Sequence, residues 1–483
     1  MESVDYSEQI TRIKKKLSKA QKVDSGLKVF GASTHKYAVG TGMPRRELVA
    51  FQKAHGIALP PDFEAFLLAF GYPNQTVMKS IAGPFYGVFN LGFDLAMIPD
   101  GSQSFLSKTS VIYPQMPPSE WKKLVNGMPE EDDAYDAYER HLMSGIYTLG
   151  EQGCSSYHGL LLTGSNRGKV INFDIEYYAD GPPRFAYENN FLDWYERWLD
   201  EIISGVLLKN KGYWFGYVMR GDEKELIEII FNAKNKEEKI MGLNGFSIID
   251  LVQSPTLKAL EQVVKTEADE VKHLALLMLT KFNSEVSRPY LKQMIAGDDA
   301  AFKAACNSIW KVAKPDAHMF EKDISIRLET VDDSETYRAA MFVLDEIDGD
   351  FASIITQGTT HSNADIRRLA FYRLGKQKFH SSLVPYFIAG LHDDEHRVVH
   401  AALQALSGSK DLRFLEPYYH IAKSYWQDDS YVLVNLKHRL DEIGFHSVPY
   451  FEKCYEAGEA QAAYKKYTSG KGFLNHLRRA FSK

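Results

Sequence analysis

The sequence predicts an α+β N-terminal domain followed by an all-α superhelical solenoid. Two observations support this prediction. A nine-residue apolar pattern with a central alanine recurs in the C-terminal half, whereas the preceding part is dense in glycine, proline and aromatic residues and mixes helix-like with strand-like runs. With 483 residues and 45% hydrophobic content, the chain is long enough for two or more domains with substantial cores.

The recurring pattern places its first, fifth and ninth residues on one face of a helix. The fifth positions are Ala275, Ala305, Ala340, Ala370, Ala402 and Leu436, at spacings of 30, 35, 30, 32 and 34 residues. An alanine at this position lets a neighbouring helix approach closely, which predicts that the five alanines are buried. A period in this range is typical of a solenoid, and two helices per period resemble HEAT-like repeats, of which we expect about six in residues 240–457.

A polar turn precedes most copies of the pattern and predicts where the next helix begins. Side chains of Asp and Asn accept hydrogen bonds from the first backbone N–H groups of a helix, and a negative charge suits its N-terminal dipole. The turns are Asp298-Asp299, Asp332-Asp333, Ser362-Asn363, Asp393-Asp394 and Asp428-Asp429.

The N-terminal part, taken in order, begins with a predicted helix from Ser7 to Lys22 within residues 1–25. Its narrow apolar stripe of Ile10, Ile13 and Leu17 predicts docking on the protein surface, although the surrounding lysines leave an electrostatic arm as the alternative. Residues 26–207 form the α+β domain. Helices are expected after Pro44 and over 59–71, opened by Pro60-Pro61 and ended by Gly71. Strands are expected at 86–91, 146–150, 159–163 and 169–173, and a closing helix at 191–199.

Five blocks of this domain, in order, resemble the SUKH superfamily. They are Phe30-Gly31-Ala32-Ser33-Thr34-His35-Lys36-Tyr37, the 59–71 helix, Gly83-Pro84-Phe85-Tyr86-Gly87-Val88-Phe89, the 150–164 hairpin region and the 191–198 helix. The superfamily includes bacterial immunity proteins and fungal cell-wall assembly regulators. The resemblance implies a fold that binds proteins and is not an enzyme. The Pro117–Ala137 segment departs from the pattern, and its acidic run is expected to be a solvated loop.

Two segments flank the predicted solenoid. Residues 208–239 are expected to be a linker, although 222–231 has the pattern of a helix. Residues 458–483 form a basic C-terminal segment. Its apolar residues Phe473, Leu474, Leu477 and Phe481 favour a cap on the last repeat, with a membrane surface or an acidic partner as the alternative.

A search for catalytic or metal chemistry singles out few residues. No Walker A loop, dinucleotide-binding glycine motif or nucleophile elbow is present, so we expect no cofactor and no enzyme activity. His392 and His396 fit a metalloprotease spacing, but the predicted inter-helix turn separates them, and no zinc is expected there. His35 and His158 have no evident carboxylate or thiol partner in the sequence.

Charge favours a protein partner over nucleic acid. The chain has a formal net charge of −6, and residues 26–205 hold 14 Lys and Arg against 21 Asp and Glu, a net of −7. The resemblance to the SUKH superfamily implies an immunity-type protein that neutralises a toxin domain, and the acidic charge adds that this toxin would be basic. We expect the protein to be cytoplasmic, without a membrane partner. The candidate partner-binding residues are Glu130, Glu131, Asp132, Asp133 and Asp136. The alternatives are a regulatory scaffold that joins two partners and, less favoured, a lyase-like enzyme accessory.

Overall fold

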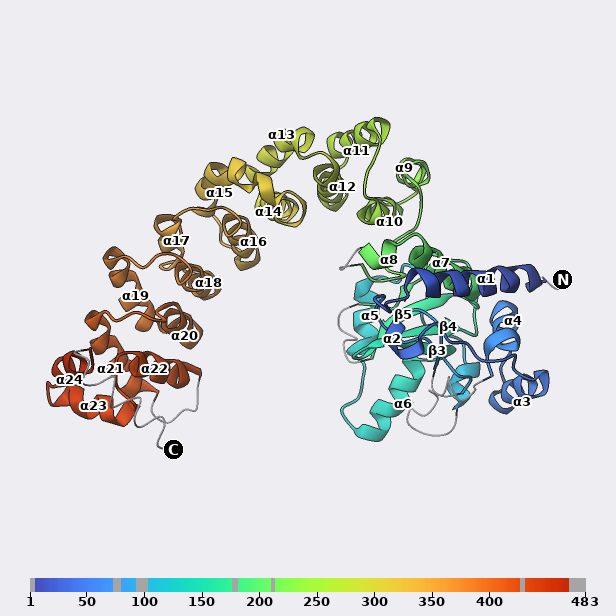
Figure 1. The fold of residues 1–483 in the computed structure, drawn as a ribbon, viewed down its shortest axis with the longest axis horizontal. Helices are drawn as coiled ribbons and strands as arrows, with labels where there is room; N and C mark the ends of the chain where they lie inside the picture. The colour runs from blue at the N-terminus through green and yellow to red at the C-terminus, as the bar shows by residue number, and fades with distance from the viewer. Residues whose placement is uncertain are drawn as a thin grey trace. The chain divides into compact units, whose positions relative to one another are not determined.

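The computed structural model describes residues 5–72, 80–92, 103–175, 181–209, 213–425 and 431–468. The chain divides into two compact units, Met1–Asp250 and Leu251–Lys483 (Figure 1). The first combines helices with a small antiparallel sheet, and the second is helical throughout its described residues. An α+β domain followed by a helical region is therefore the architecture of this chain.

The first unit is built around a four-stranded antiparallel sheet in the order β3-β4-β5-β6, with a separate β1-β2 pair. Its strands are β1 (Ser80–Ile81), β2 (Val88–Phe89), β3 (Ile146–Gly153), β4 (Ser156–Leu161), β5 (Val170–Asp174) and β6 (Arg184–Phe185). Its helices are α1 (Ser7–Val23), α2 (Ala32–His35), α3 (Arg45–His55), α4 (Pro61–Phe70), α5 (Pro118–Val125), α6 (Asp132–Leu142), α7 (Phe191–Ile203), α8 (Val206–Lys209), α9 (Glu223–Asn232) and α10 (Lys236–Gly245).

The strand register brings polar side chains together on one face of the sheet. His158 pairs with Asn172, and the neighbouring pair Tyr157–Phe173 points to the opposite face, because successive side chains alternate along a strand. The predicted strands at 146–150, 159–163 and 169–173 are present with shifted ends. The predicted strand at 86–91 is only the two-residue β2.

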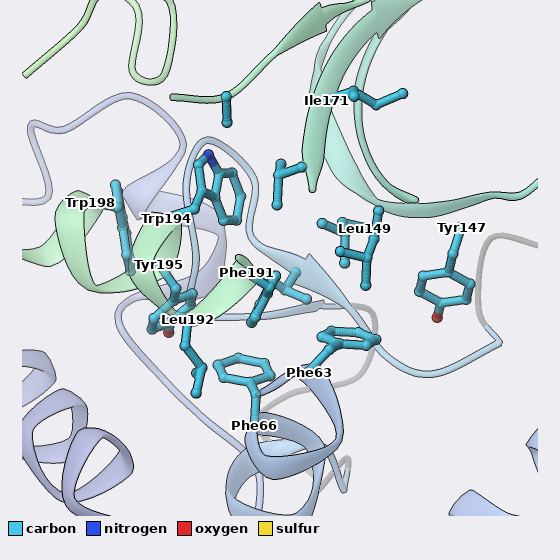
Figure 2. Packing of buried hydrophobic residues seen from close by; sticks show 14 of the residues in the cluster. Phe63, Phe66, Tyr147, Leu149, Ile171, Phe191, Leu192, Trp194, Tyr195 and Trp198 are labelled. Atoms are coloured by element: carbon cyan, nitrogen blue, oxygen red, sulfur yellow. The ribbon is translucent and has the colours of Figure 1, made fainter. Parts of the chain in front are cut away.

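Helix α7 lies at the centre of the core of the first unit. Figure 2 shows Phe63 and Phe66 of α4 directed at Phe191 and Tyr195 of α7, with ring centroids 4.8 Å apart for both Phe63–Phe191 and Phe66–Tyr195. All four side chains are fully buried. Aromatic rings bury the largest apolar areas of any side chains, so this α4–α7 contact is a main source of stability for the unit.

The beginning of α7 is held by two side chains. Asn190 accepts a hydrogen bond from the backbone N–H of Asp193, as an N-cap residue does. The buried carboxyl of Asp62, in the first turn of α4, accepts bonds from the N–H groups of Phe191 (2.8 Å) and Leu192 (3.2 Å). Asp62 therefore joins the N-terminal ends of two helices that are far apart in sequence.

Helix α1 is docked on α7 and is part of the first unit. Its stripe of Ile10, Ile13 and Leu17 is buried, as the sequence predicts. Lys16 bridges two carboxylates of α7, with Nζ 2.9 Å from Glu196 and 2.7 Å from Asp200. The stripe and these ion pairs exclude a free electrostatic arm for the described part of this helix.

The boundary between the units lies later than the linker predicted at 208–239. The first unit extends to Asp250, because α9 and α10 are helices that pack against each other. Glycines allow this approach, since a Cβ on Gly245 would lie 2.4 Å from Cδ2 of the buried Leu226. The predicted start of the repeat region, residue 240, lies within α10, whereas the second unit begins at Leu251.

The second unit is a succession of helices that pack against their neighbours along the chain (Figure 1). Its helices are α11 (Ser254–Thr266), α12 (Asp269–Phe282), α13 (Ser284–Ile295), α14 (Asp299–Val312), α15 (Glu321–Leu328), α16 (Ser334–Leu344), α17 (Ala352–Gly358), α18 (Ala364–Leu374), α19 (Val384–Leu391), α20 (His396–Ala405), α21 (Leu415–Ser424), α22 (Tyr431–Glu442), α23 (Val448–Glu456) and α24 (Ala460–Thr468). No helix among the described residues is both long and apolar enough to cross a membrane.

The pattern alanines lie where the sequence predicts. Ala275, Ala305, Ala340, Ala370 and Ala402 are all 0% exposed. They belong to α12, α14, α16, α18 and α20, and each of these helices contacts the next one in this series. The burial of these small side chains agrees with the close approach of helices that the pattern predicts.

The predicted capping turns hold in three copies and differ in a fourth. Asp298, Asp333 and Asn363 each accept a hydrogen bond from an N–H in the first turn of the next helix. At α20 the N-cap is Glu395. Asp393 instead accepts hydrogen bonds from the N–H of Glu395 and from the guanidinium of Arg367, all below 3 Å. The turn at Asp428-Asp429 and the basic C-terminal segment beyond residue 468, with Phe473, Leu474, Leu477 and Phe481, lie outside the described residues.

Candidate functional site

The five acidic residues singled out in the sequence gather at the beginning of α6. Glu130, Glu131, Asp132 and Asp133 are exposed, and Asp136 is half-buried one turn further along. The structure therefore brings all five together on a single helix end. Tyr138 of the same helix donates a hydrogen bond to the carbonyl of Leu124 at 2.9 Å, which attaches α6 to α5.

The expectation that this acidic run forms a loop is wrong. Glu131 is the N-cap of α6, and its side chain accepts a hydrogen bond from the N–H of Ala134 at 3.0 Å. Asp132 and Asp133 occupy the first turn, where the partial positive charge of the helix end favours carboxylates. The acidic run is therefore an ordered surface whose charges are held in place by helix geometry.

A second candidate site is a pocket of about 870 Å³ in the first unit. It lies beside the turn between β3 and β4, at Gly153 and Cys154. Five aromatic side chains belong to its wall. The described residues that line it are Phe30, Tyr86, Gln152, Gly153, Cys154, Ser156, Lys209, Tyr213, Trp214, Tyr217, Val218, Ser247 and Ile248. We call this site the aromatic pocket. Its volume falls in the range of small-molecule sites.

Two partly exposed rings define the mouth of the aromatic pocket. Phe30 is 52% exposed and Trp214 is 49% exposed, although their ring centroids are 5.3 Å apart. Phe30 also contacts Tyr86 edge-on at 5.4 Å. A surface of contiguous aromatic side chains left in water is typical of a site that another molecule covers.

A buried polar network lies next to the aromatic pocket, on the same strands. Gln152 Nε2 lies 2.8 Å from Asn172 Oδ1 and 3.1 Å from His158 Nδ1, and His158 Nδ1 lies 2.9 Å from Asn172 Oδ1. Tyr217 donates its hydroxyl hydrogen to Gln152 Oε1 at 3.1 Å. The network thus connects three strands to the 213–218 segment, which forms one wall of the aromatic pocket.

Arg197 of α7 holds the 213–218 wall in place. Its guanidinium contacts Glu188 and Glu201, each at 2.7 Å. The same group donates to the Tyr213 hydroxyl at 3.1 Å and to the carbonyl of Val218, so it ties both ends of the wall to α7. Gly216 has a φ of +85° and lies over the buried nitrogens of Trp194 and Asn172, which suits glycine and lets the wall lie close to the sheet.

The two histidines considered for acid–base chemistry are buried structural residues. Burial lowers the pKa of His158 to about 3, against the opposing effect of its bond to Asn172. Burial also lowers the pKa of His35 to about 4, and His35 Nδ1 accepts a hydrogen bond from the N–H of Tyr37. Both imidazoles are therefore neutral at pH 7 and are part of the packed interior of the first unit.

His392 and His396 lie at the ends of different helices, as the sequence predicts. His392 follows α19 as its C-cap, and His396 is the first residue of α20. Each pairs with a different carboxylate, His392 with Glu416 at 3.5 Å and His396 with Glu395 at 3.1 Å. Within the part of the chain that the structure describes, no three His, Cys, Asp or Glu residues group as metal ligands. The absence of zinc stays a prediction.

Sequence reasoning missed most of the aromatic pocket. Trp214 and Tyr217 fall in the segment assigned to the linker, and Phe30 was noted only as part of a family-like block. The run Trp214-Phe215-Gly216-Tyr217 was a usable signal, because three aromatic residues in four positions are unusual for a solvated linker. Trp194 and Trp198 of the predicted closing helix fill the core and are fully buried.

Comparisons with protein-family models, with curated proteins and with solved structures gave no match to this chain.

Proposed function

We propose that this chain is an immunity-type protein that binds and neutralises a basic toxin domain. In this proposal the first unit is a SUKH-like domain, and the second is a superhelical solenoid of about six HEAT-like repeats. The family resemblance of five sequence blocks supports the first assignment. The buried alanines of α12, α14, α16, α18 and α20, at spacings of 30 to 35 residues, support the second.

The observation that carries the proposal is the acidic beginning of α6. Four exposed carboxylates and the half-buried Asp136 project from one ordered helix end, on a domain whose residues 26–205 have a net charge of −7 from 14 basic and 21 acidic residues. Nuclease toxins carry basic nucleic-acid grooves. An acidic surface accelerates the encounter with such a groove and then covers it.

The experiment neutralises this surface without removing the helix cap. The variant combines Glu130→Gln, Glu131→Gln, Asp132→Asn, Asp133→Asn and Asp136→Asn, in which the Gln at position 131 keeps an oxygen for the Ala134 N–H. The matched control neutralises five exposed acids elsewhere in the first unit, namely Asp5, Glu8, Glu228, Glu237 and Asp250. The partner is the toxin-like protein encoded nearest to the gene for this chain.

The surface variant should associate with the toxin about tenfold more slowly at low salt, with a flatter salt dependence, and the control should match the wild type. Co-expression of the wild type should protect cells from the toxin. If the wild type fails to protect cells and forms no complex at low salt, the immunity proposal is wrong, and a regulatory scaffold with two protein partners takes its place.

A further inference from the structure

The aromatic pocket has the chemistry of a ligand site that the proposed function does not use. The ring centroids of Tyr86 and Trp214 lie 5.4 Å and 5.3 Å from that of Phe30, with Tyr86 edge-on to Phe30 and Trp214 tilted against it. Flat aromatic walls favour a planar ring, which can stack on them at little conformational cost. Burying the exposed rings also removes apolar surface from water, which favours binding.

The charge of the lining selects among planar ligands. Lys209 is exposed at the pocket and is the only charged side chain among the described residues that line it. None of these described lining residues carries a carboxylate that could balance an incoming cation. The ammonium of Lys209 favours a ligand that places a negative group beside it, and Gln152, Ser156 and Ser247 add polar atoms that can orient such a ligand.

The pocket is also preorganised. Arg197 and Gly216 hold the 213–218 wall against the sheet, and Phe85 stacks on Trp214 with centroids 5.3 Å apart and an interplanar angle of 20°. This stacking keeps one face of the Trp214 ring covered by the protein and presents the rest of the ring at the mouth. A site whose walls are already fixed loses little entropy when a ligand enters.

We propose that the aromatic pocket binds a planar aromatic molecule that carries an anionic group. The ligand ring stacks on Trp214. Phe30, whose plane is inclined by 55° to that of Trp214, contacts the ligand ring with its edge, and Lys209 pairs with the anion. A free nucleotide and an aromatic carboxylic acid share this chemistry. The proposal concerns a face of the first unit formed by the β3–β4 turn, Lys209 and the 213–218 segment, so its test is independent of the test of the acidic surface on α6.

The test uses 1-anilinonaphthalene-8-sulfonate (ANS), a sulfonate on a planar naphthalene ring, as the probe in a fluorescence titration of the full chain. The wild type should bind one equivalent of ANS saturably. Trp214→Ala should weaken binding about fivefold or more, because stacking on one aromatic side chain contributes about 1–3 kcal/mol. Lys209→Met should weaken it about two- to fivefold, as expected for an exposed ion pair.

Matched controls separate the pocket from general surface binding. Phe231→Ala removes a ring of similar exposure, 47%, on α9 outside the pocket, and Lys19→Met removes an exposed lysine of α1. Both should bind ANS as the wild type does. Circular dichroism of each variant checks that its fold is kept, because ANS also binds partly unfolded protein. Cys154, the one cysteine that is exposed, provides a second readout, since bound ANS should slow its alkylation.

Two competitors identify the source of the ligand. Displacement of ANS by adenosine monophosphate supports a nucleotide site, and displacement by indole-3-acetate supports an aromatic carboxylate site. The proposal is overturned by non-saturable ANS binding, by equal binding in Trp214→Ala and the wild type, by failure of both competitors, or by equally tight binding of the planar cation thioflavin T.

Discussion

Replacing His158 with glutamine should flatten the acid dependence of the stability of the first unit. His158 is fully buried, and the side chains around it are uncharged, with Gln152 and Asn172 on the neighbouring strands and Phe85 and Trp194 packed against its ring. Burial lowers its pKa from 6.5 to about 3 in the folded protein. The unfolded chain therefore binds a proton at mildly acidic pH that the folded chain excludes.

The direction and size of the effect follow from this difference. Stability from the neutral imidazole is fully present above about pH 6.5 and is lost progressively as the pH falls towards 3. A solution at pH 5 is 1.5 units below the pKa of 6.5 that the imidazole has in the unfolded chain, and each unit corresponds to about 1.4 kcal/mol. The free energy of unfolding should therefore be about 2 kcal/mol lower at pH 5 than at pH 7.5 because of His158. That is a shift of about 1 M in a urea midpoint.

The assay must report on the first unit alone. Protein equilibrated in urea at each pH is pulsed with deuterium, and peptides that cover β4 and β5 are read by mass spectrometry. His158→Gln should lose less stability than the wild type between pH 7.5 and pH 5, by about 2 kcal/mol. The control, His141→Gln, changes an exposed histidine of α6 and should keep the wild-type dependence. Equal pH slopes in His158→Gln and the wild type would refute the reasoning.

Two further predictions concern packing. Asp62→Ala should destabilise the first unit by about 3 kcal/mol, because it leaves the Phe191 and Leu192 N–H groups of α7 without their charged acceptor. Asp62→Asn should cost less, because one oxygen remains to accept a hydrogen bond. The same deuterium pulse measures both variants, and a loss below about 1 kcal/mol in Asp62→Ala would contradict this prediction. Ala370→Leu should destabilise the second unit by about 1–3 kcal/mol, because α17 leaves no room for a larger side chain: even a Cβ added to Gly358 would lie 3.0 Å from the Ala370 Cβ. Hydrogen exchange of peptides from α17 and α18 measures the loss. The control Ala462→Leu, at an exposed position, should leave the stability unchanged.

Local sequence patterns predicted the elements whose signals lie within one segment. The stripe of α1, the proline that begins α4 and the alanine pattern of α12 to α20 depend on spacing along a single helix, and the structure places each where the pattern predicts. The strands near 146–150, 159–163 and 169–173 were found for the same reason, because alternation and flanking turns are local features.

The conformation of the acidic segment was harder to predict, because its helix begins at a capping residue of an unusual type. Residues 130–133 read as a solvated loop by composition. The structure instead uses Glu131 as an N-cap, a position where Ser, Thr, Asp and Asn are preferred. The sequence therefore predicted that the five candidate residues lie together, but it did not predict the helix that holds them in an ordered conformation.

By itself, the sequence determined the α+β unit, the helical region after it and the burial of the repeated alanines, since each follows from periodicity within a short window. Only the tertiary structure decided the partners of distant side chains. Asp62 meets the N-terminus of α7 across 129 positions, and strand pairing brings His158 and Asn172 together across 14. The aromatic pocket likewise exists only because the 213–218 segment folds back beside Phe30 and Tyr86. No local pattern encodes these long-range contacts, because they depend on several elements packing together at the same time.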